Sequence, residues 1–126
     1  MGQMIVADYF TNHYKEHILN VRAGLRRKCD ALTAALQEHF GHTAGVEQPR
    51  GGIYLWVKLP EGVDCRQFVG PAMQEGIGFI PGPDWSADPE AAANYIRLCF
   101  ALPREAEVWE GIEKLARVFQ LGGGKV

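Results

Sequence analysis

The sequence lacks the features that mark membrane, nucleic-acid-binding and disulfide-stabilised proteins. No apolar run approaches the ~20 residues that a membrane-spanning helix needs. The formal net charge is -2, so no basic excess would attract nucleic acid or anionic lipid. The three cysteines form an odd, scattered set without metal-ligand spacing, which is typical of reduced thiols. These absences predict a cytoplasmic protein whose partners include neither nucleic acid nor a membrane.

The sequence also lacks recognisable catalytic machinery. It contains no G-x-S-x-G, no Walker loop and no G-x-G-x-x-G, and its cysteines have no placed histidine partner. The lysines fall on expected helix faces, a strand face or the C-terminal tail, which are poor places for a nucleophile. They are Lys15, Lys28, Lys58, Lys114 and Lys125. We therefore predict no catalytic residue in this chain.

What the 126 residues do contain is enough apolar sequence for one hydrophobic core. Residues 1–12 are expected to be a lead-in, with Thr11 or Asn12 capping the helix that follows. Steps of three and four then predict one long amphipathic helix over residues 14–40. Its apolar stripe is Tyr14, Ile18, Val21, Leu25, Cys29, Leu32, Leu36 and Phe40. We expect a single domain over residues 13–121 and a flexible tail over residues 122–126.

Alternating β-forming residues predict two clear strands, at residues 53–59 and 95–101, and two short ones, at residues 43–48 and 77–80. A helix is expected from Asp64 to Gly76, broken at Gly70-Pro71, and another at residues 104–119. Their inward residues should be Phe68, Val69, Ala72 and Met73, and Val108, Trp109, Ile112, Leu115, Ala116 and Phe119. The order predicts an α+β fold with a small, mainly antiparallel sheet of three or four strands packed against helices.

Arg97 is the residue most suggestive of binding. Strand alternation places it on the face opposite Ile96 and Leu98, where a long cation must find an anion or reach water. Its planar fork suits a carboxylate through two parallel hydrogen bonds. Tyr54 and Trp56 share one face of the other clear strand, and would form an aromatic wall beside Arg97 if the two strands pair. A solvated surface arginine is the alternative.

A second, weaker motif is His13-Tyr14-Lys15-Glu16-His17, which matches the H-x-x-E-H pattern of inverted zinc proteases. Both histidines would lie on one helical face, as metal ligands do. The motif needs a further ligand from elsewhere, and short patterns of this kind also arise by chance. We predict no metal site and interpret His17 as a packing or capping residue.

Several stretches together resemble the C-terminal small domain of fold type I, class I/II, pyridoxal-phosphate-dependent aminotransferases, in the 2-aminoadipate/MocR-like branch. Nearly the whole chain takes part, including the upstream segment around Arg22 and residues 26–32, which is similar to the family's interdomain helix. The stretches are Pro49-Arg50-Gly51-Gly52-Ile53-Tyr54-Leu55-Trp56-Val57-Lys58-Leu59-Pro60, Gly76-Ile77-Gly78-Phe79-Ile80-Pro81-Gly82 and Tyr95-Ile96-Arg97-Leu98-Cys99-Phe100-Ala101.

This resemblance implies roles for two residues. Arg97 falls on the family's carboxylate-binding arginine, and Tyr54 on a pocket-lining aromatic that helps to bind the substrate. The cofactor lysine and the rest of the pyridoxal phosphate site would belong to a large domain preceding Met1. Two departures stand out: Gly70-Pro71 interrupts a usually continuous helix, and Trp85 occupies a loop position more often held by Phe. Neither is expected to touch Arg97, but the second could alter side-chain specificity.

The leading hypothesis is therefore the C-terminal domain of an amino-acid aminotransferase that closes over the active site of a missing large domain. The full-length enzyme would use pyridoxal 5'-phosphate, an amino acid and a 2-oxo acid, and would form a homodimer. The chain alone should be inactive and carry no cofactor. The alternative is a freestanding α+β regulatory module that binds a carboxylate or amino acid on the same sheet face. A metal site at His13, Glu16 and His17 is a third hypothesis.

Overall fold

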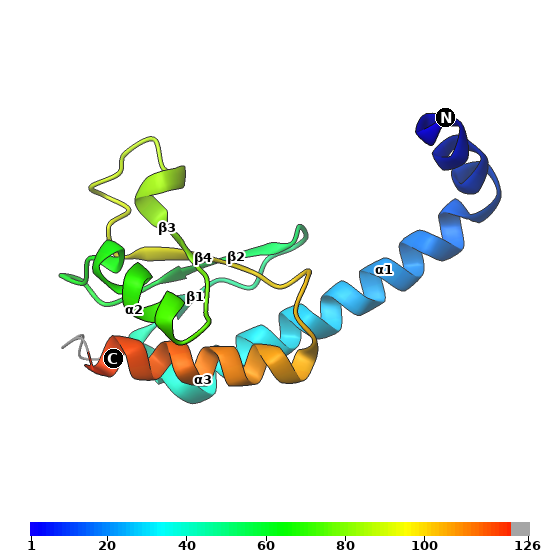
Figure 1. Ribbon diagram of the computed structural model, residues 1–126. Helices are drawn as coiled ribbons and strands as arrows, with labels where there is room; N and C mark the ends of the chain where they lie inside the picture. The colour runs from blue at the N-terminus through cyan, green and yellow to red at the C-terminus, as the bar shows by residue number, and fades with distance from the viewer. Residues whose placement is uncertain (122–126) are drawn as a thin grey trace.

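A computed structural model describes residues 1–121, and it opens with one very long helix. Helix α1 spans Gly2–Phe40, so the expectation of a lead-in capped at Thr11 or Asn12 is wrong. The side chains of these two residues instead donate to the carbonyls of Ala7 and Asp8, four residues earlier. Such bonds often bend helices, and Figure 1 shows the first turns of α1 at an angle to the rest. The expected tail, residues 122–126, lies outside the described residues.

The remaining elements follow in the predicted order but several are shorter than expected. The two clear strands are found, whereas the two short ones contain only two residues each. The elements after α1 are η1 (Gly41–Thr43), β1 (Gly45–Val46), β2 (Tyr54–Lys58), η2 (Cys65–Phe68), α2 (Val69–Gln74), β3 (Ile80–Pro81), η3 (Gly82–Trp85), β4 (Tyr95–Cys99) and α3 (Glu105–Leu121), where η denotes a 3-10 helix.

The strands form one antiparallel sheet in the order β1-β2-β4-β3. Its centre is the β2–β4 pair, in which Trp56 faces Arg97 and Val57 faces Ile96. On the other side of β4, Arg97 faces Ile80 of β3. The predicted α+β class, with a four-stranded antiparallel sheet and packed helices, is confirmed.

One face of this sheet makes the core with α1 and α3. Figure 1 shows α3 running alongside the second half of α1 beneath the sheet, while the first half of α1 extends away. Phe119 of α3 is fully buried and its ring contacts those of Phe40, Phe68 and Phe79. These contacts join α3 to α1, to η2 and to the segment before β3, so burial of apolar surface at this point holds the layers together.

The predicted stripe of α1 is buried only where α3 and the sheet cover it. Cys29, Leu32, Leu36 and Phe40 are buried, whereas Tyr14 and Val21 are exposed. Two other inward predictions are wrong: Met73 is 68% exposed at the end of a short helix, and Trp109 is 40% exposed at the margin of α3. No helix within residues 1–121 has the length and apolar character needed to cross a bilayer.

Gly70-Pro71 does not break a longer helix, because it lies in the first turn of α2. The first amides of a helix have no carbonyl partner within the helix, so Pro71 loses nothing there. The preceding turn, η2, is capped by Asp64, whose carboxylate accepts the Arg66 backbone N–H at 3.0 Å. The capping residue is therefore as expected, although its partner is Arg66 rather than Gln67.

Gly82, the first residue of η3, makes the closest backbone approach described in this fold. A Cβ atom there would lie 2.5 Å from the carbonyl oxygen of Ala92 and 2.8 Å from the Cβ and carbonyl oxygen of Tyr95. Only glycine fits, and its absence of a side chain lets η3 lie directly against the start of β4.

We therefore expect Gly82→Ala to lower the free energy of unfolding by about 1–3 kcal/mol, the usual cost of forcing extra atoms into a packed site. Gly111→Ala is the matched control. Its new methyl group would meet nothing within 4 Å, and alanine in a helix interior should raise the stability by about 0.5–1 kcal/mol. Urea denaturation of both variants measures the two effects; equal stabilities would contradict the close approach.

Candidate functional site

The candidate site is built around Arg97, in the middle of β4. Its side chain is enclosed, with the residue only 8% exposed. The central guanidinium carbon lies 3.7 Å from the centroid of the Trp85 ring and 4.2 Å from that of the Tyr54 ring. Two rings therefore contact the guanidinium, one from β2 and one from η3. We call Trp85 and Tyr54 together the aromatic clamp.

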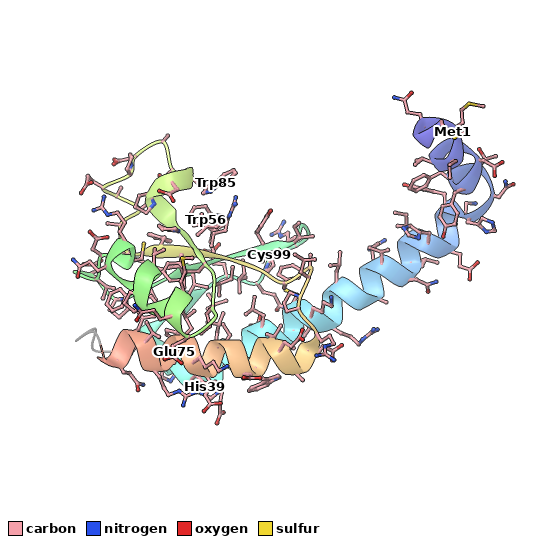
Figure 2. The ribbon with its side chains drawn as sticks, viewed as in Figure 1. Met1, His39, Trp56, Glu75, Trp85 and Cys99 are labelled. Carbon is pink, nitrogen blue, oxygen red and sulfur yellow. The ribbon has the colours of Figure 1, made fainter. Side chains whose placement is uncertain are left out.

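The β2–β4 register brings Tyr54 to this place. Tyr54 faces Cys99 across the ladder, two residues along β4 from Arg97, which makes it the diagonal neighbour of Arg97 on the same face. Trp56 faces Arg97 directly, and its ring contacts that of Tyr95. The predicted aromatic wall beside Arg97 is thus present on the sheet face turned away from α3. Figure 2 shows Trp56 and Trp85 together on that side.

The charge of Arg97 has no anionic partner within the described chain. Among residues 1–121, no carboxylate lies within 4.0 Å of its guanidinium nitrogens. Its Nε is buried and has no hydrogen-bond partner there. The aromatic faces attract the cation but accept no ordinary N–H···O bond. The alternative of a solvated surface arginine is therefore wrong, and the site is chemically suited to an oxyanion such as a carboxylate.

Trp85 contacts Arg97, so the expectation that this loop residue does not touch Arg97 is wrong. The resemblance had singled out Trp85 only for side-chain specificity. Trp85 lies in η3, outside any alternating or helical pattern, so periodicity gave no reason to place it on the Arg97 face. The remaining local signal is the preceding Pro81-Gly82-Pro83, a sequence that favours a tight turn. Its side chain remains 60% exposed although one face covers the guanidinium.

A separate hollow of about 490 Å³ lies between α1 and the turn that precedes β2. Its basic residues are Arg22, Arg26 and Arg50, and its acidic residue is Asp30, which already accepts from Gln48 at 3.1 Å. Arg97 does not line this hollow. The turn at residues 49–52 and the Arg97 face are therefore distinct surfaces of the chain.

The H-x-x-E-H motif lies on an exposed part of α1. His17 makes a 3.3 Å contact between its Nδ1 and the Tyr9 hydroxyl, and its ring packs edge-on against Tyr9 and Phe10. Within residues 1–121, no group of three or more His, Cys, Asp or Glu side chains is placed to hold a metal ion. The contacts of His17 agree with its interpretation as a packing residue.

No family model matches the chain, but individual proteins do. The 2-aminoadipate transaminase of Thermus thermophilus is 27% identical over 120 residues, which is 95% of this chain and 30% of that protein. The α-aminoadipate aminotransferase LysN of the same species, solved in complex with N-(5'-phosphopyridoxyl)-L-leucine, superposes with a TM-score of 0.87 at 26% identity, over 98% of this chain and 32% of that one. The chain has the fold of an aminotransferase small domain.

The predicted resemblance to fold type I aminotransferases is thereby confirmed. The chain is also similar to transcriptional regulators. The uncharacterised HTH-type transcriptional regulator YdfD of Bacillus subtilis is 28% identical over 116 residues, which is 91% of this chain and 23% of that protein. The chain spans about 30% of the length of the curated aminotransferases that it matches.

Among residues 1–121, four lysines could in principle hold pyridoxal phosphate, and each is placed elsewhere. Lys28 donates to the Ala101 carbonyl at 2.7 Å, and Lys58 and Lys114 pair with glutamates on the surface. Lys15 is exposed on α1. None of these four is enclosed in an apolar pocket as a cofactor lysine would be. Lys125 lies outside the described residues.

The cysteines of the small domain differ in environment. Burial raises the pKa of the Cys29 and Cys65 thiols, which both lie in the core. Cys99 is exposed, on the same face as the clamp and opposite Tyr54. Alkylation needs an accessible thiolate, so the three residues should react at different rates.

We expect iodoacetamide at pH 8 to modify Cys99 first in the folded chain, leaving Cys29 and Cys65 unmodified until urea unfolds it. Peptide mass spectrometry measures the order. The Cys99→Ser variant should take up almost no label while folded. Labelling of Cys29 or Cys65 at the Cys99 rate would show that the core is more open than described.

Proposed function

We propose that this chain is the small domain of a pyridoxal-phosphate-dependent amino-acid aminotransferase, in which Arg97 binds the substrate α-carboxylate and Tyr54 lines the same pocket. The observation that supports this most is a buried guanidinium for which residues 1–121 provide no anionic partner, on the sheet face turned away from α3. The similarity to aminotransferases over nearly the whole chain supports the same assignment.

In this proposal the clamp leaves the edge of the guanidinium as the route by which a carboxylate can approach. Two parallel N–H···O bonds would then fix both the position and the orientation of the carboxylate, and with it the neighbouring Cα. Tyr54 and Trp56 would exclude water from one side of that contact, which strengthens it. Pyridoxal phosphate, held by a large domain, would supply the electron sink.

The large domain would also cover the first half of α1. Apolar side chains there, including Ile5, Phe10, Tyr14 and Leu19, are exposed in this chain. A long helix with apolar residues on its projecting half is suited to packing against a second domain. We propose that the complete enzyme closes this small domain over an active site in the large one, and that it acts as a homodimer on an amino acid and a 2-oxo acid.

The 126-residue chain alone should not bind pyridoxal phosphate stoichiometrically. Incubation with the cofactor followed by borohydride should leave no single labelled lysine, because none of the four lysines in the described residues lies in a suitable pocket. Absorption spectroscopy and peptide mass spectrometry measure the outcome. One lysine labelled in full would contradict the proposed division of the active site.

The role of Arg97 can be measured in a chimera in which this chain replaces the matched segment of the Thermus 2-aminoadipate transaminase. Loss of a charged, bidentate contact costs about 1.5–3 kcal/mol. Arg97→Ala should therefore lower kcat/KM for amino acids about 10- to 150-fold.

Arg66→Ala is the matched control, because Arg66 is an arginine whose charge is already paired, with Asp64 and Glu90 on the surface. It should leave kcat/KM within about twofold, the scale of a surface ion pair. Unchanged kinetics in the Arg97→Ala chimera would refute the assigned role.

The similarity to HTH-type regulators supports one alternative, a regulatory module that senses an amino acid or another carboxylate on the same face. Calorimetry of the 126-residue chain with amino acids and 2-oxo acids separates the two proposals. Micromolar binding by the chain alone favours the module, whereas an aminotransferase small domain should need its large domain to hold the substrate.

A further inference from the structure

We propose that Trp85 is the positioning residue of the site: it holds the Arg97 guanidinium in the orientation in which a carboxylate can bind, and Gly82 holds Trp85. This inference rests on the proposed function of Arg97. In this proposal η3, a four-residue turn, sets the orientation of the Arg97 side chain, which belongs to β4.

The first step is the geometry of the clamp. An arginine side chain has four rotatable bonds before its planar group, so a buried arginine needs contacts to fix that plane. In many sites carboxylates do this, but in residues 1–121 no acidic side chain pairs with Arg97. The cation–π contacts within these residues are those with the rings of Trp85 at 3.7 Å and Tyr54 at 4.2 Å. Two aromatic faces therefore contact the fork where no acidic side chain does.

The two rings do not contribute equally. Tyr54 belongs to β2 and is fixed by the central ladder of the sheet. Trp85 is closer to the guanidinium carbon, and indole is the ring that attracts cations best. Trp85 is also supplied by a turn rather than by a strand. Its position consequently requires a separate explanation.

That explanation lies at both ends of the turn. At its start, Gly82 is in direct contact with the backbone of Ala92 and Tyr95, so η3 is seated against the strand that carries Arg97. Just after it, the Ser86 hydroxyl donates to the Asp88 carbonyl and accepts the Asp88 backbone N–H. The contact at Gly82 holds the start of η3 against residues 92 and 95, and the bonds of Ser86 order the loop that follows the indole.

The exposure of Trp85 makes the inference testable. The residue is 60% exposed, so its removal takes little apolar surface out of the core. Trp85→Ala should therefore fold, while the guanidinium gains rotational freedom and binds a carboxylate less well. Trp85→Phe keeps an aromatic face and should restore most of the lost orientation.

The experiment uses the same chimera, with an L-amino acid and with the corresponding primary amine, which lacks the α-carboxylate. We expect Trp85→Ala to raise KM for the amino acid about tenfold, within the range of a desolvated cation–π contact, and to leave the rate with the amine unchanged. Trp85→Phe should return KM to within about threefold of the native value. Trp109→Ala, on α3 beside His39, is the control for loss of a tryptophan and should change neither substrate.

A second measurement uses the 126-residue chain itself and needs no activity. The ring current of Trp85 should shift the Arg97 Nε–H resonance in an NMR spectrum, and Trp85→Ala should remove that shift whereas Trp109→Ala should not. An unchanged Arg97 resonance in Trp85→Ala would overturn the clamp.

The outcomes for the Arg97→Ala and Trp85→Ala variants distinguish a failure of this inference from a failure of the proposed function. If Arg97→Ala impairs amino-acid turnover but Trp85→Ala does not, the positioning role is refuted and the function of Arg97 stands. If Trp85→Ala impairs the amine and the amino acid equally, Trp85 has only a structural role. If Arg97→Ala has no effect, both the proposed function and the positioning role fail.

Discussion

The register of the β2–β4 ladder is the constraint on which the rest of this structure depends. It sets Trp56 opposite Arg97 and Val57 opposite Ile96, and so divides the residues of both strands between two faces. Because side chains alternate, a slip of one residue would turn Arg97 into the core and Ile96 out of it. The apolar face excludes that slip, since Val57 and Ile96 are fully buried against the helices. Burial of the core thus determines on which face the Arg97 cation lies.

The opposite face of the sheet carries Arg97, a buried cation with only some of the partners that a buried charge needs. A buried charge ordinarily needs a counter-ion and hydrogen-bond acceptors. In residues 1–121, Arg97 has the attraction of two aromatic faces and no acidic partner, and its Nε has no acceptor. The π faces offset part of the desolvation cost while leaving the N–H donors unused. A carboxylate supplies both the charge and the acceptors that are missing, which is why ligand chemistry can be argued from one side chain.

Much of this could be predicted from the sequence where a pattern repeats. Alternation in two strands was enough to place Arg97, Tyr54 and Trp56 on one face once the strands pair. The spacing of apolar residues predicted the face of α1 that is buried near its C-terminal end, but not that the same stripe is exposed at Tyr14 and Val21. A repeating pattern was not always enough, and prediction failed at two kinds of position. Met73 and Trp109 matched the helical period, yet lie at margins that no neighbour covers. Residues 2–12 are helical because the backbone continues through Thr11 and Asn12, whose side chains bond backwards instead of capping.

Trp85 explains why the site itself was only partly predictable. A sheet face is a local property, readable from every second residue, whereas a turn that folds back over that face is a tertiary one. The position of η3 depends on the close approach of Gly82 to Ala92 and Tyr95. A contact of that kind leaves no periodic pattern in the sequence. Different residues therefore stabilise the fold and orient the Arg97 cation. The packed residues of β2 and β4 stabilise the fold, the exposed rings orient the cation, and Gly82 is the point where a change in packing reaches both.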